Sequence, residues 1–505
     1  MNFTEFLKEN LVILDGGMGT LLQQEGLRPG EYPERWNLSR PQTITRVHRD
    51  YYDAGSHVVC TNTFGANALK FSEVELEAIV RAAIENAGAA REQSRRPGEK
   101  FIALDIGPSG RLLKPLGDLD FEDAVELFAK TVRLGVKYGV DLILIETMND
   151  CYETKAALLA ARENSDLPVL VSNAYSEDGK LLTGASPAAM VAMLEGMGAE
   201  AIGANCSLGP AQLRDVALEL LEHASVPVFL KPNAGLPRLQ NGNTVFDVEP
   251  EEFARELQKL AALGLRLAGG CCGTTPAYIQ KLSESLAGSR PLPVVEKQHT
   301  VVSSYSHAVF FGDSPILIGE RINPTGKKRF RQALLEQDMD YLLGEAVRQQ
   351  EKGVHILDVN VGLPEIDEAE MLRRSVCQLQ SVVDLPLQID TADPIAMEAA
   401  LRRYNGKAMI NSVSGKRESM EAVFPLVKKY GGVVVALTLD ENGMVVDFSR
   451  IKELVHGKLD HQFLNDVMDA NPTAENMARW ICEQVPHCYK VQIQESEGNL
   501  VEYEV

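Results

Sequence analysis

The sequence predicts an α/β protein whose residues 1–287 form a (β/α)8 TIM barrel. Short runs of aliphatic or β-branched residues alternate with longer segments in which apolar residues recur at helical spacing, as in 75–85 and 212–221. There are eight such short runs, which matches the strand number and length typical of this barrel. The predicted strands are 11–14, 57–60, 101–106, 141–145, 168–171, 201–205, 227–230 and 266–268.

Composition limits the classes of protein to which the chain can belong. A chain of 505 residues is too long for one hydrophobic core, so two or three domains are expected. It contains no apolar run of the ~18 residues that a membrane span needs, and its first residues do not resemble a signal peptide. A formal net charge of −21 disfavours binding to nucleic acid. We therefore expect a cytoplasmic protein with neither nucleic-acid nor membrane partners.

Cysteine positions predict a metal centre. Eight cysteines are too few for a disulfide framework in a chain of this length. Cys206 ends the sixth predicted strand, and Cys271 and Cys272 follow the eighth, so all three thiols belong to the same rim of the barrel. Three thiolates with one open position are typical of catalytic zinc. The other cysteines have no such partners and are expected to be ordinary residues: Cys60, Cys151, Cys377, Cys482 and Cys488.

This ligand set favours one kind of chemistry. Three thiolates give the zinc site a net negative charge, which makes the ion a weak activator of water. The same ion still binds an incoming thiol as a thiolate, although a free thiol is mostly protonated at neutral pH. The predicted reaction is therefore alkyl transfer to the sulfur of a thiol substrate.

Other polar residues at the predicted strand ends suit an amino-acid substrate. Asp15 and Glu146 offer carboxylates for an ammonium group, and the turn that contains Gly107 and Ser109 offers backbone N–H groups for a carboxylate. Asn233 follows the seventh strand and is expected to bind the substrate at the same rim. Acids at a barrel rim can also serve only to orient loops, so each of these assignments has a purely structural alternative.

Six motifs together resemble the homocysteine-binding barrel of cobalamin-dependent methionine synthases. They are Asp15-Gly-Gly-Met-Gly-Thr, Thr61-Asn-Thr-Phe, Glu146-Thr-Met, Gly203-Ala-Asn-Cys, Pro232-Asn-Ala-Gly and Gly269-Gly-Cys-Cys-Gly. The resemblance implies that Cys206, Cys271 and Cys272 bind zinc and that Glu146 belongs to the catalytic site. Homocysteine sulfur would take the fourth zinc position and attack a methyl group to give methionine.

Two alternatives remain at this point. Methyltransferases that use betaine or S-methylmethionine have a similar barrel, so the methyl donor can be another small molecule. The chain can also be an inactive fusion that binds zinc and a thiol without turnover.

A second β–α series is predicted in 313–441, after a loose linker at 288–312 that contains Pro291 and Pro293. Its strands are expected at 316–318, 355–359, 385–389, 407–410 and 433–437, with Asp and Asn at their ends, which suits an amino-pyrimidine ring. Gly319-Glu-Arg-Ile-Asn-Pro-Thr-Gly and Leu357-Asp-Val-Asn-Val-Gly resemble the methyltetrahydrofolate barrel of the same family, which is related to pterin-binding enzymes. The residues that the resemblance places in a pterin pocket are Glu320, Asn323, Asp358, Asn360, Asp390 and Asn411.

We expect this second barrel to be incomplete, because further strand–helix units of the family barrel do not follow Leu437. No cobalamin-binding domain is recognised after it. Methylcobalamin is therefore expected to be supplied free or on another chain, with 5-methyltetrahydrofolate as the ultimate methyl source.

Residues 442–505 are predicted to form a small α+β tail. Asn471 followed by Pro472 is a helix start, and 491–496 and 499–505 alternate like two antiparallel strands. The tail resembles the C-terminal half of 6-pyruvoyl- and 6-carboxy-tetrahydropterin synthases, which implies proton transfer by Asp460 and His461 and pterin binding by Glu495. That family's zinc-binding half is not present, so no tetrahydropterin synthase activity is expected.

Overall fold

The computed structural model describes residues 1–240, 243–312, 314–437, 474–484, 490–496 and 499–504. The chain forms two compact units. One consists of Met1–Ser412 with Val423–Val435, and the other of Val413–Ala422 with Ala436–Val505. Within the described residues, no helix is both long enough and apolar enough to cross a membrane.

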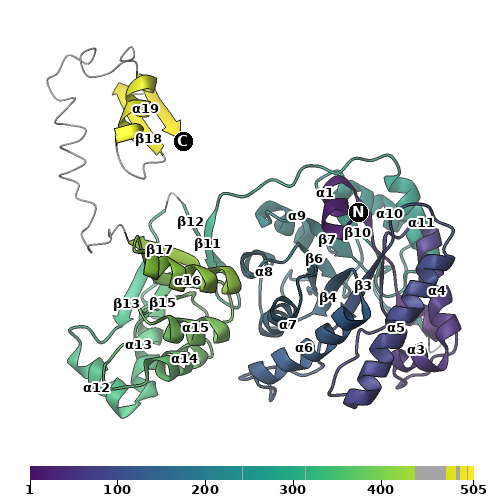
Figure 1. Cartoon of the computed structure of the whole chain (residues 1–505), viewed down its shortest axis with the longest axis horizontal. Helices are drawn as coiled ribbons and strands as arrows, with labels where there is room; N and C mark the ends of the chain where they lie inside the picture. The colour runs from purple at the N-terminus through teal and green to yellow at the C-terminus, as the bar shows by residue number, and fades with distance from the viewer. Residues whose placement is uncertain (241–242, 313, 438–473, 485–489, 497–498, 505) are drawn as a thin grey trace. The chain divides into compact units, whose positions relative to one another are not determined.

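The first part of the chain is the predicted barrel of eight parallel strands (Figure 1). Neighbouring strands follow the order β1-β10-β7-β6-β5-β4-β3-β2, and each pair in this order is parallel. All eight predicted strands are confirmed, with ends shifted by up to a few residues. Their bounds are β1 Val12–Ile13, β2 Val58–Cys60, β3 Phe101–Ile106, β4 Leu142–Met148, β5 Val169–Asn173, β6 Ala201–Asn205, β7 Val228–Lys231 and β10 Leu267–Ala268.

Side chains help to close the barrel between β1 and β2. The backbone N–H of His57 donates to the Ile13 carbonyl at 2.7 Å, and the Ile13 N–H donates to His57 Nδ1 at 2.9 Å. Three residues further along the chain, toward the rim, the Cys60 N–H donates to Asp15 Oδ2 at 2.7 Å. An imidazole and a carboxylate thus occupy places that backbone groups occupy elsewhere in the sheet, so Asp15 is part of the barrel wall.

Helices cover the outside of the barrel (Figure 1). Several begin with a side-chain cap, as where Ser72 accepts the N–H of Glu75 and Asp120 accepts that of Glu122. The helices are η1 Pro33–Arg35, α2 Met18–Gln24, α3 Trp36–Ser39, α4 Pro41–Ala54, α5 Glu73–Gln93, α6 Phe121–Tyr138, α7 Cys151–Asn164, α8 Pro187–Gly196, α9 Arg214–His223, α10 Pro250–Ala261 and α11 Pro276–Leu286.

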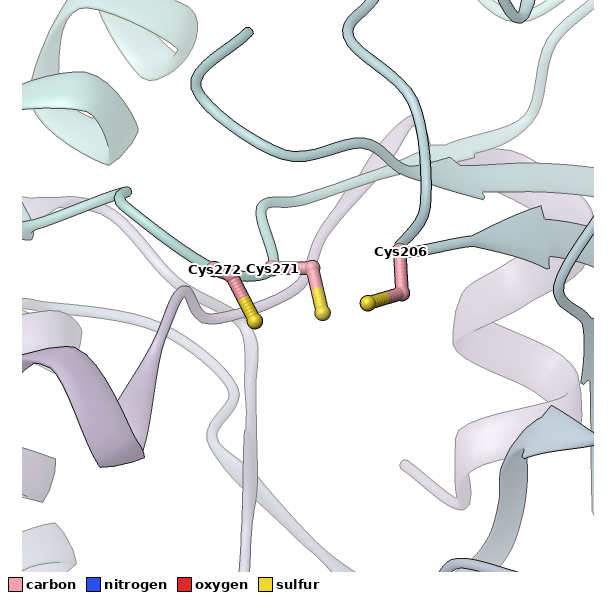
Figure 2. A group of neighbouring side chains, drawn as sticks. All are labelled: Cys206, Cys271 and Cys272. Atoms are coloured by element: carbon pink, nitrogen blue, oxygen red, sulfur yellow. The ribbon is translucent and has the colours of Figure 1, made fainter. Parts of the chain in front are cut away.

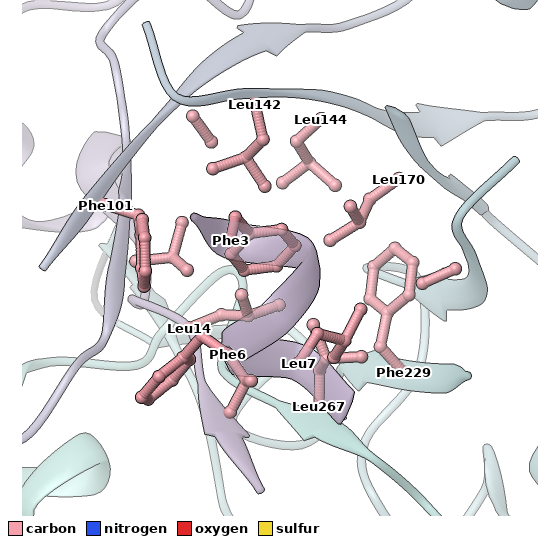
Figure 3. Packing of buried hydrophobic residues seen from close by; sticks show 14 of the residues in the cluster. Phe3, Phe6, Leu7, Leu14, Phe101, Leu142, Leu144, Leu170, Phe229 and Leu267 are labelled. Atoms are coloured by element: carbon pink, nitrogen blue, oxygen red, sulfur yellow. The ribbon is translucent and has the colours of Figure 1, made fainter. Parts of the chain in front are cut away.

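An additional helix, α1 (Phe3–Glu9), closes the end of the barrel where the strands begin. A capping box between Asn2 and Glu5 starts it. Phe3, Phe6 and Leu7 lie in one buried cluster with the first residues of several strands, and the rings of Phe3 and Phe101 are 5.3 Å apart (Figure 3). Because apolar side chains fill this end, polar chemistry is left to the opposite rim.

A short hairpin follows β7 at the rim. It consists of β8 (Arg238–Gln240) and β9 (Asn243–Val245), which pair antiparallel. Phe246, directly after β9, lies close against Gly273 and lines the cavity that also contains the thiols. The hairpin therefore brings an aromatic wall to the loop of Cys271 and Cys272.

The predicted linker is more ordered than a loose connection. It contains an antiparallel hairpin of β11 (Thr300–Ser303) and β12 (Ala308–Phe311). The hairpin is tied to the second sheet, because Ser303 donates its N–H to the Lys407 carbonyl at 2.9 Å and accepts the Tyr404 hydroxyl at 2.7 Å. These long-range hydrogen bonds organise a segment whose composition alone suggested irregular structure.

The second sheet has five strands among the described residues, in the order β13-β14-β15-β16-β17. All five predictions are confirmed, although the first strand starts later than expected and includes residues assigned to the loop after it. The strands are β13 Ile318–Ile322, β14 Ile356–Val359, β15 Leu387–Asp390, β16 Met409–Ser414 and β17 Val433–Leu437. The helices are α12 Lys328–Glu336, α13 Met339–Glu351, α14 Glu368–Leu379, α15 Pro394–Arg403 and α16 Arg417–Tyr430.

In the second unit, helix α19 (Ala474–Gln484) is followed by β18 (Lys490–Ser496) and β19 (Asn499–Glu504). The two strands pair antiparallel, as their alternation predicted. Glu495 lies on β18. The expected helix start at Asn471 and Pro472, and the Asp460–His461 pair, lie outside the described residues.

Candidate metal centre and substrate cavity

Three thiols meet at the C-terminal rim of the barrel, as predicted. Cys206 follows β6, Cys271 and Cys272 follow β10, and their sulfur atoms all lie within 4.8 Å of one another (Figure 2). A tetrahedral zinc ion with Zn–S bonds of about 2.3 Å holds its sulfurs about 3.8 Å apart. Small rotations of the side chains therefore bring this donor set to zinc geometry.

The end of β7 holds both cysteine loops in place. The Cys206 N–H donates to the Lys231 carbonyl at 3.0 Å, and the Cys271 N–H donates to the Pro232 carbonyl at 2.8 Å. The Cys272 N–H donates to Asn233 Oδ1 at 3.1 Å. Cys206 itself has φ of +60°, a left-handed conformation that ordinary residues rarely adopt and that is frequent at functional sites.

The two glycine-rich motifs allow two loops to approach closely. A Cβ atom on Gly17 would lie 2.7 Å from the Cys271 carbonyl oxygen. Thr274 Oγ1 accepts the Gly17 N–H at 3.1 Å and donates to the Cys271 carbonyl at 2.6 Å, while Gly270 donates its N–H to the Asp15 carbonyl at 2.8 Å. The glycines are therefore required by the distance between the loops.

Charge decides what the thiols can bind. Hydrogen bonds from Cys271 and Cys272 hold the pKa of Cys206 well below its usual value. The same hydrogen bonds to Cys206 hold the pKa values of Cys271 and Cys272 well above theirs. Without a cation, the cluster thus favours one thiolate and two protonated thiols. A divalent cation would remove this restriction, because it compensates the charge of all three thiolates.

A cavity of about 700 Å³ lies at the rim beside the thiols. This volume is in the ~300–1,000 Å³ range of small-molecule sites. Its wall contains the three cysteines together with buried charged groups: Asp15, Asp105, Glu146 and Lys231. The site therefore joins a cluster of three thiols to a strongly polar floor.

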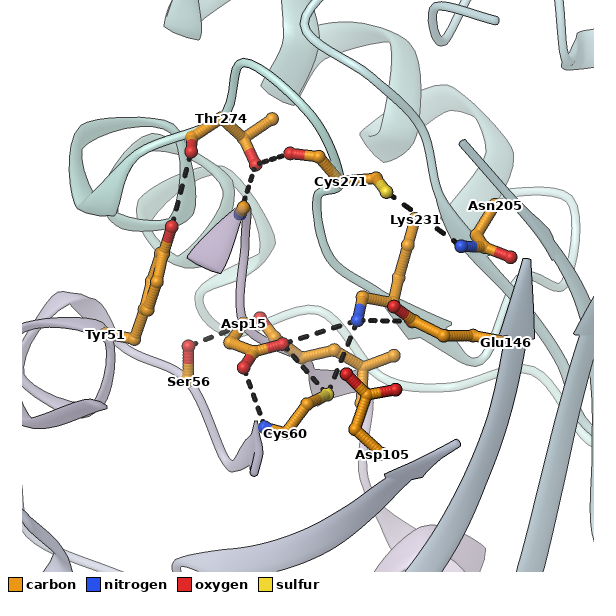
Figure 4. A network of polar contacts seen from close by, with 12 residues as sticks. Asp15, Tyr51, Ser56, Cys60, Asp105, Glu146, Asn205, Lys231, Cys271 and Thr274 are labelled. Atoms are coloured by element: carbon orange, nitrogen blue, oxygen red, sulfur yellow. Dashed lines mark hydrogen bonds and ion pairs between the residues drawn. The ribbon is translucent and has the colours of Figure 1, made fainter. Parts of the chain in front are cut away.

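Lys231, the last residue of β7, is central to this floor, although we did not predict it (Figure 4). Its Nζ lies 2.7 Å from Glu146 Oε2, 3.4 Å from Asp15 Oδ1 and 3.4 Å from Cys60 Sγ. Burial lowers the pKa of Lys231, but the neighbouring carboxylates of Glu146 and Asp15 raise it well above its usual value. The lysine is therefore a buried ammonium group within the polar floor.

Cys60 also has a role that its isolation in the sequence did not indicate. Its thiol donates to Asp15 Oδ1 at 3.1 Å. Burial raises its pKa well above the usual value, so it remains a thiol. The sequence contained one signal for a role at the rim: Cys60 ends a predicted strand and is followed directly by the polar residues Thr61, Asn62 and Thr63.

Asn205 links Glu146 to the thiol cluster. Its Oδ1 accepts the Thr147 N–H at 2.7 Å, and its Nδ2 donates to Thr147 Oγ1 at 2.7 Å. The same Nδ2 lies 3.9 Å from Cys271 Sγ. Since Thr147 follows Glu146 and Asn205 precedes Cys206, this side chain sets the spacing between the carboxylate and the thiols.

Three residues predicted to bind homocysteine have other contacts in the structure. Gly107 donates its N–H to the Phe64 carbonyl at 2.9 Å, and Ser109 donates its N–H to Glu153 Oε1 at 2.8 Å. Asn233 uses its amide oxygen to hold Cys272. None of the three is among the residues that line the described cavity. The structure thus brings Asp15 and Glu146 to the cavity but not Gly107, Ser109 and Asn233.

The second sheet gathers most of the predicted pterin residues at its C-terminal edge. Asn360 Nδ2 donates to Asp390 Oδ2 at 3.0 Å, and Asp390 pairs in register with Asn411. Asp358 is 2% exposed and accepts a short hydrogen bond from Gln388, a residue that we did not predict. Burial raises the pKa of Asp358 to about 6. These side chains offer paired donors and acceptors on neighbouring strands.

The two remaining predicted residues are at β13. Glu320 lies on the strand, and its largely exposed side chain is 3.4 Å from Lys327 Nζ. Its charge contributes to raising the pKa values of Asp358 and Asp390. Asn323 is buried and accepts the N–H of Thr325 at 2.9 Å. Glu320 therefore acts electrostatically on Asp358 and Asp390, while Asn323 shapes the turn after β13.

Comparison with known families agrees with this geometry. The family model for homocysteine S-methyltransferases matches residues 12–286, which is more than half of the chain. The chain belongs to the homocysteine S-methyltransferase family. A second family model, for pterin-binding enzymes, matches residues 319–497.

Two curated relatives are methionine synthases. The enzyme from Mycobacterium tuberculosis is 31% identical over 463 residues, and that from Mycobacterium leprae is 31% identical over 468 residues. Each match covers 87% of this chain and 39% of the relative, so the chain spans about two fifths of their length. The metallated homocysteine methyltransferase MmuM from Escherichia coli has a TM-score of 0.49 and 24% identity, with 56% of this chain and 98% of that chain covered.

The raised pKa of Asp358 predicts a pH-dependent stability. Between about pH 4 and pH 6 the folded state keeps a proton that the unfolded state releases, so stability falls as pH rises through this window. Asp358→Asn removes this loss and should gain about 2 kcal/mol relative to the wild type between about pH 4 and pH 7. Urea unfolding at both pH values measures the difference. The exposed Asp340→Asn is the control, and parallel behaviour of Asp358→Asn and the wild type would contradict the prediction.

Proposed function

We propose that Cys206, Cys271 and Cys272 bind zinc and that the cavity beside them binds homocysteine for methylation to methionine. The observation that carries this proposal is the meeting of three thiols at one rim of the barrel, next to buried carboxylates. Three thiolates leave one zinc position for a ligand. Zinc in this place would supply a Lewis acid that lowers the pKa of the substrate thiol and favours its thiolate.

The residues of the chain would orient the substrate. Burial raises the pKa of Glu146, and the hydrogen bond from Lys231 opposes this shift and favours the carboxylate. Asn205 fixes the distance between Glu146 and the thiol cluster. Asp15 and Glu146 give the cavity the negative charge that an amino-acid ammonium group requires. Gly107, Ser109 and Asn233 are better supported as framework residues, because their donors and acceptors already hold Glu153, Phe64 and Cys272.

The transfer itself is a nucleophilic substitution at carbon. The deprotonated homocysteine sulfur forms a bond to the methyl carbon, and the bond between that carbon and the donor breaks. The electron pair of the broken bond stays on the donor. The product is a thioether, which is a weaker ligand for a divalent cation than a thiolate and can therefore leave.

We propose methylcobalamin, supplied free or by another chain, as the donor, and 5-methyltetrahydrofolate as the ultimate methyl source. The methionine synthase relatives and the pterin-binding match at 319–497 support this choice over betaine or S-methylmethionine. Asp358, Asn360, Asp390 and Asn411 would bind the pterin.

For the α+β tail we propose no tetrahydropterin synthase activity. Free thiols need a reducing compartment, which supports a cytoplasmic location.

Cys206→Ser tests the metal centre. Wild-type protein should contain about one zinc per chain and transfer methyl groups from methylcobalamin to homocysteine. The variant should lose zinc and more than about 100-fold of the transfer rate, because one of three ligands is gone. Zinc is measured by atomic emission, and transfer by methionine formation.

Cys377→Ser is the matched control, because Cys377 lies on α14, outside the thiol cluster. It should retain both zinc and transfer. Zinc that survives Cys206→Ser, or transfer that does not require zinc, would contradict the proposal. Transfer from S-methylmethionine or betaine but not from methylcobalamin would favour the other donor class.

Asp390→Asn tests the folate site. Loss of the carboxylate should weaken binding of 5-methyltetrahydrofolate about tenfold, because a charge-assisted hydrogen bond is removed. Isothermal titration calorimetry measures the affinity. Asp340→Asn, an equal charge change on the exposed side of α13, should bind folate as the wild type does. Zinc content should not change in either variant, and an unchanged folate affinity in Asp390→Asn would count against this site.

A further inference from the structure

A second, much smaller pocket lies where the barrel, the linker hairpin and the second sheet meet. Its cavity has a volume of about 40 Å³. A water-sized probe needs roughly 10–15 Å³, so the cavity has room for a few waters or for one small ion. The polar residues that line it are Glu195, His223, Ser225, Lys297, His299 and Lys407.

Three segments that are far apart in the chain build this pocket. The Lys297 N–H donates to Ser225 Oγ at 2.8 Å, which ties the linker to the segment between α9 and β7. The Lys407 N–H donates to Ser303 Oγ at 3.0 Å, which ties the second sheet to the linker hairpin. The backbones of both lysines are therefore held in place before any ligand binds.

The pocket is separate from the thiol cavity and from the candidate pterin residues. Ser225 precedes β7, whereas Lys231 ends that strand at the thiol rim, so the pocket belongs to the opposite end of the barrel. Lys407 precedes β16, whereas Asn411 lies further along the same strand. Neither homocysteine nor a pterin at the proposed sites would therefore occupy this pocket.

Two ammonium groups of the pocket have no partner. Among the described residues, neither Lys297 Nζ nor Lys407 Nζ makes a hydrogen bond or an ion pair. Burial lowers the pKa of Lys407, and the charge of Glu195 opposes this shift only in part. Glu195 is itself engaged, because its Oε2 accepts the Ser225 N–H at 2.9 Å. A ligand that brings negative charge would offset the cost of the unpaired ammonium groups.

The uncharged polar groups of the pocket can act as hydrogen-bond donors. His223 Nδ1 is buried and has no hydrogen-bond partner. Ser225 Oγ accepts the Lys297 N–H, so its own proton is free to be donated. The Phe310 ring orients both imidazoles, with centroid distances of 4.9 Å to His223 and 5.9 Å to His299. Two ammonium groups, a hydroxyl and an imidazole on one small cavity match the acceptor oxygens of an oxyanion.

A metal ion suits this pocket less well than an anion. His223, His299 and Glu195 are residue types that bind metals. Their ligand atoms do not, however, form a group within 4.8 Å in the part of the chain that the structure describes. The two lysines would also repel a cation. The charge of the pocket therefore selects for an anion, although the chain as a whole has a formal net charge of −21.

We propose that this pocket binds a small oxyanion of the phosphate or sulfate type, held by Lys297, Lys407 and His223. The ion would link the barrel, the linker hairpin and the second sheet through side chains that have no other partner. The inference is independent of the thiol cluster and of the proposed methyl transfer. Such an ion can be free in solution or can be the phosphate group of a larger metabolite.

Titration of inorganic phosphate into the zinc-loaded chain, followed by calorimetry at constant ionic strength in chloride, tests the inference. The wild type should bind about one phosphate per chain at this pocket. Lys407→Gln should weaken binding at least about tenfold, because a charge-assisted hydrogen bond is lost. Lys297→Gln should show a similar loss, and it takes the place of Lys407→Gln if that variant does not fold. Unchanged zinc content shows that each variant is folded.

Lys352→Gln is the matched control, because it makes the same charge change at the exposed end of α13, outside the pocket. It should bind phosphate as the wild type does. Equal phosphate affinity in the wild type, Lys407→Gln and Lys297→Gln would overturn the site. Absence of binding to the wild type below about 10 mM phosphate would also overturn it.

Glycerol phosphate in place of inorganic phosphate distinguishes the two sources of the ion. Much weaker binding of this ester would support the site with a free ion as its ligand. Binding that is as tight, and is lost to the same extent in Lys407→Gln, would support the site with a phosphorylated metabolite as its ligand.

Discussion

The buried ammonium group of Lys231 and the backbone around it are the feature on which the whole site depends. The Nζ atom draws Glu146 and Asp15 together, at 2.7 Å and 3.4 Å. The carbonyls of Lys231 and Pro232 accept the N–H groups of Cys206 and Cys271. One strand end therefore sets both the carboxylates and two of the three thiols. The buried carboxylates of Asp15 and Glu146 would repel each other without the lysine, and a buried lysine would be costly without them.

The barrel determines at which of its two ends the carboxylates, Lys231 and the thiols gather. Helix α1 fills the end where the strands begin with apolar side chains, so the polar groups gather at the opposite rim. The wall between β1 and β2 is completed by His57 and Asp15, which makes a candidate substrate residue part of the frame. The second sheet uses the same principle with a different chemistry. There, Asp358 with Gln388 and Asn360 with Asp390 offer matched donors and acceptors suited to a flat heterocycle.

Periodicity and the rule for parallel strand ends were enough to predict the thirteen strands of the two sheets, the meeting of Cys206 with Cys271 and Cys272, and the Asp–Asn cluster. Helix α1 was missed because seven residues carry too little periodic signal. Lys231 and Asp105 were missed because a buried charge is recognised only when its partners are known in space. Gly107 and Ser109 were placed in the site from their turn, but the distant Glu153 and Phe64 satisfy that turn. A local sequence pattern carries no information about contacts between residues far apart in the chain, and these contacts are what the predictions missed.

The most direct test of the central claim is X-ray absorption at the zinc edge, recorded on the zinc-loaded chain before and after addition of homocysteine. The account predicts sulfur neighbours at about 2.3 Å from the three cysteines, and one additional sulfur neighbour when homocysteine is present. A spectrum that homocysteine does not change, or a first shell made mainly of nitrogen and oxygen, would contradict it.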